Sequence, residues 1–123
     1  MRAIAFAALV ATLIVPTLPA QAGDAEAGAR VFRIQCGACH VTEAGKNRVG
    51  PSMHGIVGRV SGQVEGFRYS PANRDAKVVW TPEVLEKYLA NPKEVVPGTT
   101  MAYVGLKNAT QRADLIAFLE AQK

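Results

Sequence analysis

The chain has very few side chains that bind metals or form disulfides. Its 123 residues include only two cysteines, two histidines and three methionines. A structural zinc site needs about four protein ligands, and Cys36, Cys39, His40 and His54 are the only cysteines and histidines that could supply them. Any disulfide is limited to one short bridge between Cys36 and Cys39, so a disulfide-rich scaffold is excluded.

Strong charge of one sign is also lacking. The sequence has 14 basic and 10 acidic residues, no run of five like charges, no repeat and no low-complexity segment. Without Arg2, which belongs to a predicted leader, 13 basic and 10 acidic residues leave a net charge of +3. Proteins that bind nucleic acid usually carry clustered Lys and Arg on one face. We therefore predict no nucleic-acid partner.

The N-terminal residues have the three-part pattern of a secretory signal peptide. Met1-Arg2 is a short positive segment, residues 3–15 are mostly apolar, and Ala20-Gln21-Ala22 has the small-x-small form of a cleavage site. The apolar run is shorter than the roughly 18 residues that a spanning helix needs. We predict a signal peptide over 1–22 and one exported domain over 23–123, with no stable membrane insertion after cleavage. An uncleaved anchor is the alternative.

The most specific motif is the pentad Cys36-Gly37-Ala38-Cys39-His40. Cys-x-x-Cys-His is the spacing that attaches a c-type haem: two thiols form thioethers and the next residue supplies an axial nitrogen. A redox-active dithiol of the thioredoxin kind also uses Cys-x-x-Cys, but in a βαβ context that is not seen around Cys36. A structural zinc site or a plain disulfide could also use these cysteines. The motif favours one covalently bound haem c.

Capping signals and apolar spacing predict an all-α fold of four to five short helices with long loops. A first helix should begin at Asp24 and run into the pentad, and a second should follow Ser70-Pro71 to about Lys77. A third should lie between Thr81 and Asn91, and a last one should begin at Asn108. The segment 42–68 contains six glycines and is predicted to be an ordered functional loop.

A haem bound by His40 has a second axial position to fill. The sulfur and nitrogen candidates are Met53, His54 and Met101. Met101 lies 61 residues after His40 in a loop between two predicted helices, where its sulfur could reach the iron or simply plug the core. Met53 is only 13 residues from His40 and is better interpreted as an apolar wall residue.

Taken together, these motifs resemble class I cytochrome c, the short-chain bacterial and mitochondrial type. The resemblance covers essentially the whole predicted domain. The matching stretches, in the family's order, are Cys36 to His40, Gly50-Pro51-Ser52-Met53-His54-Gly55, Gly58-Arg59, Gly66-Phe67-Arg68-Tyr69-Ser70, Trp80, Tyr88-Leu89-Ala90-Asn91-Pro92-Lys93, Pro97-Gly98-Thr99-Thr100-Met101 and Asp114-Leu115-Ile116-Ala117-Phe118-Leu119. The combination is far more specific than the pentad alone.

The resemblance implies the haem ligands and their support. Cys36 and Cys39 would be the thioether anchors, and His40 and Met101 the axial ligands. The Pro51 carbonyl would accept a hydrogen bond from the other ring nitrogen of His40 and so fix its orientation.

The resemblance also implies two groups of polar side chains around the haem. One group would contact the buried propionate: Tyr69, Trp80 and Arg59. The other would form a polar network near the methionine sulfur: Asn73, Tyr88 and Thr99. His54 would be structural, and Gly28 and Phe32 would meet Phe118 where the first and last helices cross.

The function implied is one-electron transfer by a soluble, periplasmic, monomeric carrier that is not an enzyme. Histidine–methionine ligation favours the ferrous state and raises the reduction potential. With both axial positions filled, no site is left for oxygen or a substrate. The alternative is a haem enzyme or gas-binding domain in which Met101 is off the iron.

Partners are expected to be redox proteins that dock briefly at the haem edge. The basic residues predicted at this rim are Lys46, Arg48, Lys93 and Lys107. The chain departs from the family pattern at Gln35, Glu94 and Thr100, where lysine is often found, and at Tyr103, where the aromatic residue is often phenylalanine. The three positions without lysine weaken the expectation of a strongly acidic partner, whereas the change at Tyr103 is mild.

Overall fold

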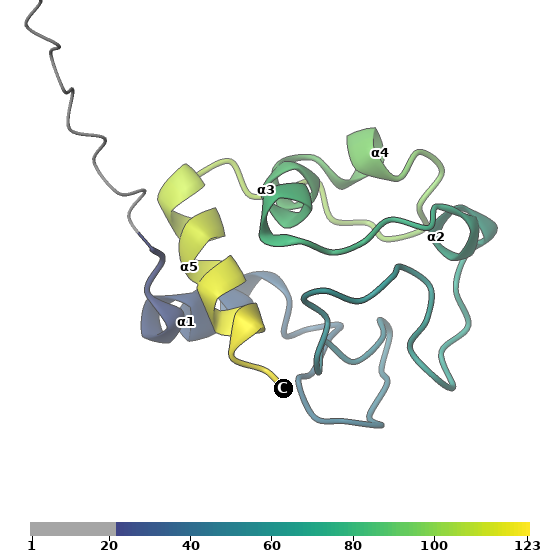
Figure 1. Ribbon diagram of the computed structural model, residues 1–123, viewed down its shortest axis with the longest axis horizontal. Helices are drawn as coiled ribbons and strands as arrows, with labels where there is room; N and C mark the ends of the chain where they lie inside the picture. The colour runs from purple at the N-terminus through teal and green to yellow at the C-terminus, as the bar shows by residue number, and fades with distance from the viewer. Residues whose placement is uncertain (1–21) are drawn as a thin grey trace, which may run out of the picture.

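The computed structural model describes residues 22–123, which form five helices and no named strand (Figure 1). The helices are α1 (Ala25–Gln35), α2 (Pro71–Asp75), α3 (Pro82–Ala90), α4 (Pro92–Val95) and α5 (Ala109–Glu120). The all-α prediction is confirmed. Residues 1–21 lie outside the described residues, and so does almost all of the predicted leader.

Side-chain caps begin four of the helices, where the sequence signals predicted them. Each cap accepts hydrogen bonds from backbone N–H groups that the first helical turn leaves without a partner. The capping residues are Asp24 for α1, Ser70 for α2, Thr81 for α3 and Asn108 for α5. Because these contacts span two or three residues, they were readable from the sequence alone.

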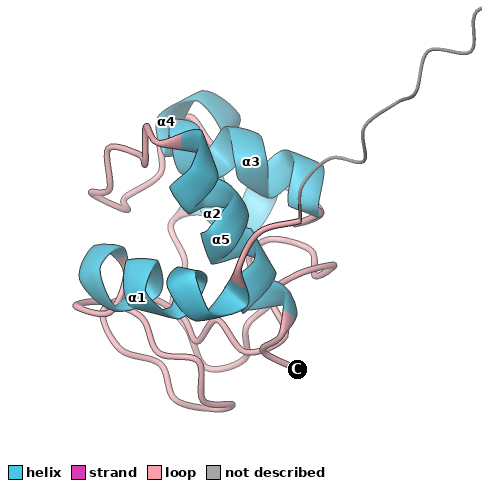
Figure 2. Ribbon diagram, turned by 90° about the vertical axis from the view of Figure 1, so that its left-hand side faces the viewer, coloured by secondary structure: helices cyan, strands magenta, loops and turns pink. Residues whose placement is uncertain are grey.

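The first and last helices cross at very short range (Figures 1 and 2). Gly28 of α1 is buried, and a Cβ there would overlap the Asp114 backbone of α5. The rings of Phe32 and Phe118 pack beside this contact with centroids 5.3 Å apart, and Leu115 is fully buried at the crossing. The predicted meeting of the two helices is confirmed, and it brings the two ends of the domain together.

The remaining core lies under α3 and the segment that follows it. Trp80, Leu85, Leu89, Val96 and Leu106 are all buried in one apolar cluster. The Leu106 N–H donates to the Leu89 carbonyl at 2.7 Å, which ties the chain before α5 to the end of α3. This pairing fixes the end of the segment between α4 and α5.

Two helix boundaries differ from the predictions. The second helix was expected to reach about Lys77 but ends at Asp75, and Lys77 has a positive φ of 51°. Asn91-Pro92 does end α3, but Pro92 is also the first residue of the short helix α4, which was not predicted. Proline fits the first turn of a helix, because no intrahelical partner is needed for its missing N–H.

The segment between α1 and α2 is an ordered loop, as predicted from its glycines. It runs along the side of the molecule away from the α1–α5 crossing (Figure 1). An isolated β-bridge joins Val60 to Val79, and the buried Ser61 hydroxyl accepts from the Val78 N–H at 3.0 Å. Within residues 22–123 we find no helix of the length and apolarity that crossing a membrane requires.

Candidate haem site

The pentad forms a tight turn directly after α1. The Cys39 and His40 N–H groups both donate to the Cys36 carbonyl, at 3.0 and 2.9 Å. One turn therefore carries both cysteines and the histidine, as the motif requires. Neither cysteine is in a disulfide, and both are partly buried. Two free thiols beside one imidazole are the donor set that covalent haem attachment needs.

The surroundings of the thiols do not suit a dithiol oxidoreductase. Burial, with a smaller contribution from Cys39, raises the pKa of the Cys36 thiol to about 11. A reactive thiol needs a lowered pKa, because the thiolate is the nucleophile. The fold also has no βαβ unit in its described part. In the same part, no three His, Cys, Asp or Glu side chains group to form a metal site.

His40 is held in one orientation by its neighbours 50 and 51. Its Nδ1 lies 2.8 Å from the Pro51 carbonyl oxygen, so an Nδ1–H can donate there and Nε2 is left free for a metal. The ring packs on Gly50, where any Cβ would overlap three of its atoms. We did not predict this role of Gly50 from the sequence. Its position directly before Pro51, in a stretch that matches the family, could have indicated it.

Met101 lies at the end of a chain of polar contacts. The Tyr88 hydroxyl approaches the Met101 sulfur at 3.7 Å. The Met101 N–H donates to the Thr99 hydroxyl at 3.2 Å, and that hydroxyl donates to Asn73 Oδ1 at 2.8 Å. Ser70 also donates to Asn73, at 2.9 Å. The structure thus places the three predicted network residues around the predicted sulfur ligand.

Tyr88 is suited to be a donor in this network. Burial, partly opposed by the neighbouring Asn73 amide, raises the pKa of the Tyr88 phenol to about 12. The hydroxyl therefore stays protonated at neutral pH. Its ring packs against Trp80 with centroids 4.5 Å apart, which limits its movement.

Of the three residues expected at a propionate, Trp80 and Arg59 are joined by a backbone hydrogen bond, and Tyr69 is bonded to the backbone of Val64. The Trp80 N–H donates to the Arg59 carbonyl at 2.9 Å, and the Tyr69 hydroxyl accepts from the Val64 N–H at 3.0 Å. Neither the Tyr69 O–H nor the Trp80 indole N–H donates to another residue within 22–123. Burial raises the pKa of Tyr69, and the Arg59 charge opposes that shift. Two donors and a cation are therefore available for an anionic group.

The two other axial candidates, Met53 and His54, lie in the loop that follows the pentad. The Met53 N–H donates to the carbonyl of Val41, the residue after His40, at 2.8 Å, and its side chain packs against the core. The His54 N–H donates to the Ser52 hydroxyl at 3.2 Å. Of the three candidates, Met101 is the one whose side chain makes a hydrogen bond within residues 22–123.

Comparison with known proteins agrees with this site. The model of the cytochrome c family matches residues 25–123. Cytochrome c 2.1 of Caenorhabditis elegans is 50% identical over 101 residues, which cover 82% of this chain and 91% of that protein. Cytochrome c type-1 of Ascaris suum is 49% identical over 108 residues, with 88% and 95% covered. Cytochrome c2 of Rhodopila globiformis is 48% identical over 101 residues, with 82% and 95% covered.

The chain belongs to the cytochrome c family. It is a monohaem class I member that binds haem c covalently and carries electrons rather than catalysing a reaction. The predictions of family, fold, cofactor and electron-carrier class are confirmed. The residues that the site brings together fit the group: two free thiols, an oriented imidazole, a thioether sulfur and two unused donors.

The packing of Gly50 on His40 gives a sharp test. Alanine at position 50 would force the imidazole to turn and break its 2.8 Å contact with Pro51. We expect Gly50→Ala to lower the free energy of unfolding by about 1–3 kcal/mol through overpacking and to disturb the low-spin spectrum of the haem protein. Thermal unfolding and visible spectroscopy measure both.

Gly45→Ala is the control for this change. A Cβ at position 45 would have nothing within 4 Å, although the φ of 72° there favours glycine. This variant should show only the backbone cost of about 1 kcal/mol and keep the wild-type spectrum. A Gly50→Ala protein with an unchanged spectrum would contradict the proposed packing role.

Proposed function

We propose that Cys36 and Cys39 form the thioether bonds to the haem and that His40 and Met101 are its axial ligands. Supporting this are the free thiols, the Nδ1 contact that leaves His40 Nε2 available, and the polar network that ends at the Met101 sulfur. The network is the observation that carries the assignment of Met101, because within residues 22–123 no hydrogen bond reaches the Met53 sulfur. When bound, the haem supplies a one-electron redox centre.

The remaining pocket residues hold and orient the haem in this proposal. Tyr69 and Trp80 would donate to a propionate, and Arg59 would offset its charge. Asn73 and Thr99 would fix the Met101 backbone, and Tyr88 would donate to its sulfur. Hydrogen bonds to ligands and propionates, together with burial, are the means by which a protein tunes a haem potential.

The proposed activity is electron transfer through the exposed haem edge. With His40 and Met101 both on the iron, the protein's residues have no substrate to position and no proton to transfer. These residues would instead keep the same two ligands on the iron in both redox states. A rigid pocket suits this task, because little reorganisation is then needed between the two redox states.

We further propose that the protein is exported to the bacterial periplasm and acts there as a soluble monomer. The leader pattern of residues 1–22 supports export. Haem that is attached covalently cannot dissociate, which suits a carrier that meets its partners outside the cytoplasm. The relatives named cytochrome c and cytochrome c2 come from several kinds of organism and do not by themselves assign a compartment.

Docking would use the four basic residues predicted at the haem rim. Arg48 donates to the Gly37 carbonyl at 3.2 Å, which fixes it beside the cysteines. Lys107 donates to the Ala90 carbonyl at 2.7 Å, and Lys46 pairs with Glu43 at 3.9 Å. Lys93 is exposed at the start of α4. Charges at the rim of a transient interface mainly set the association rate.

Removing the proposed sulfur ligand tests the assignment directly. We expect Met101→Ala to let the ferrous protein bind carbon monoxide and to lower the reduction potential by on the order of a tenth of a volt or more. Potentiometric titration followed by the visible spectrum measures the second effect. Met53→Ala is the control and should change neither; wild-type protein that itself binds carbon monoxide would refute the carrier proposal in favour of an enzyme or sensor.

Export and haem attachment are tested by mass. Protein recovered from the periplasm of a bacterial host that attaches haem c should have the mass of residues 23–123 plus one haem. Cys36→Ser with Cys39→Ser should give no covalently bound haem. A recovered mass that includes residues 1–22 would contradict cleavage and support the uncleaved anchor.

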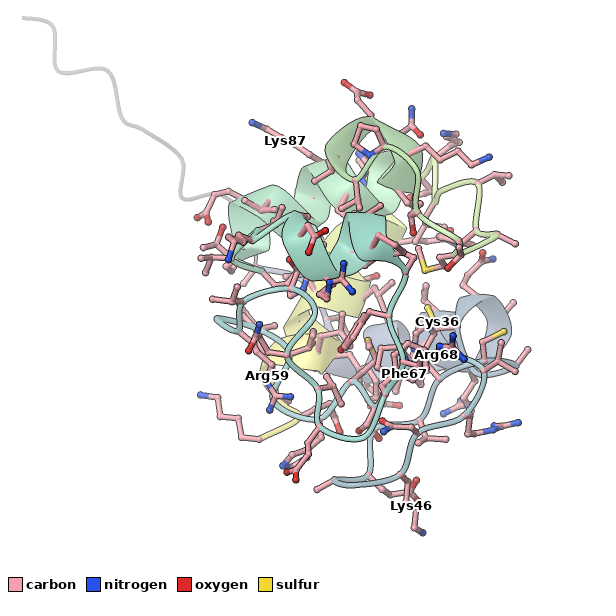
Figure 3. All side chains as sticks on the ribbon, turned by 90° about the vertical axis from the view of Figure 1, so that its right-hand side faces the viewer. Cys36, Lys46, Arg59, Phe67, Arg68 and Lys87 are labelled. Carbon is pink, nitrogen blue, oxygen red and sulfur yellow. The ribbon has the colours of Figure 1, made fainter. Side chains whose placement is uncertain are left out.

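The rim charges are tested with a small anionic redox probe. We expect the rate of electron exchange with hexacyanoferrate to fall as ionic strength rises, because the attraction is screened. Arg48→Glu and Lys93→Glu should each slow the exchange several-fold at low salt. Lys87→Glu is the control, because Lys87 is not among the predicted rim residues and points outward from α3, at the opposite end of the molecule from Lys46 in Figure 3. Equal effects of all three substitutions would show that only net charge matters.

A further inference from the structure

Gln35 and Tyr103, two departures from the family pattern, are joined by a hydrogen bond in this structure. The Tyr103 hydroxyl donates to Gln35 Oε1 at 3.0 Å, although the residues are 68 positions apart. Gln35 is the last residue of α1 and precedes Cys36, while Tyr103 follows Met101 by two residues. The contact therefore joins the proposed haem anchor to the loop that carries the proposed sulfur ligand.

The rest of this loop is tied to other elements. Residues 99 and 101 belong to the network of Asn73, and the backbone of Leu106 is bonded to Leu89 of α3. Lys107 reaches the Ala90 carbonyl. Within 22–123, residues 102–105 make one hydrogen bond to α1, and its donor is the Tyr103 hydroxyl. Opening it would free this stretch from the anchor.

We propose that the Gln35–Tyr103 hydrogen bond is a latch that keeps the loop closed and Met101 on the iron. Both residues act through Met101 and are positioning residues. The latch deepens the proposed function and rests on the assignment of Met101 as a ligand. It would suppress the conversion of this carrier into a form whose iron binds external ligands.

The physical argument concerns populations of two states of the loop. An external ligand can occupy the iron only in the fraction of molecules from which Met101 has withdrawn, so its apparent affinity scales with that fraction. A hydrogen bond made only in the closed state lowers the open fraction. Because Gln35 is exposed and Tyr103 only partly buried, the effect of one such bond should be modest.

Imidazole binding to the ferric haem protein, followed by its visible spectrum, measures the open fraction. We expect Tyr103→Phe and Gln35→Leu each to tighten imidazole binding by about two- to tenfold, the range for one net hydrogen bond. The double variant should match the single variants, because either change alone removes the whole contact. Gln35→Glu should restore near wild-type binding, since a carboxylate oxygen also accepts from the phenol.

Gln63→Leu is the matched control. Gln63 is an exposed glutamine that makes no hydrogen bond to another residue within 22–123, so its replacement should leave imidazole binding unchanged. If Tyr103→Phe fails to fold, the exposed position 35 still carries the test. Unchanged affinity in the single variants, or effects that multiply in the double variant, would overturn the latch.

The wild-type spectrum separates failure of the latch from failure of the proposed function. If the wild-type protein lacks the spectrum of methionine-ligated haem, the assignment of Met101 is wrong and the latch falls with it. If that spectrum is present but the variants bind imidazole as wild type does, the latch alone is refuted.

Discussion

The close approach of α1 and α5 at Gly28 is the contact on which the rest of the structure depends. The absence of a side chain at position 28 allows the backbones to meet, and the tilted rings of Phe32 and Phe118 then pack beside the crossing. Since α1 leads directly into the pentad, fixing α1 also fixes the turn that carries Cys36 and His40. The site is thus held in place by a helix crossing that has no part in its chemistry.

The two halves of the haem site come from opposite ends of the domain. The pentad and the Gly50-Pro51 support lie in the first half, whereas Met101 and its network depend on α2, α3 and the segment before α5. A small chain buries a limited fraction of its surface, and the long loop between α1 and α2 supplies only Ile56 and Val64 to the buried apolar residues. A covalently held macrocycle would complete such a core, which explains how long loops can be ordered here.

Keeping methionine on the iron is what separates a carrier from a ligand-binding haem protein. In the proposed site, the Tyr88 hydroxyl and the Asn73–Thr99 contact would hold Met101 from the buried side. On the exposed side, the proposed latch adds the contact between Tyr103 and Gln35. A neutral Gln35 would also leave the proposed docking rim without a positive charge at this position, so loop closure and attraction of partners would be linked at position 35.

The sequence by itself determined the pentad, the four side-chain caps and the set of candidate ligands. These features depend on contacts between residues a few positions apart, so their spacing is enough to recognise them. The early end of α2 at Asp75, the helix begun by Pro92 and the packing of Gly50 on His40 were decided by the tertiary structure. So was the bond between Gln35 and Tyr103. Each of these joins or constrains segments whose approach is set by the whole fold, and local spacing carries no information about such distances.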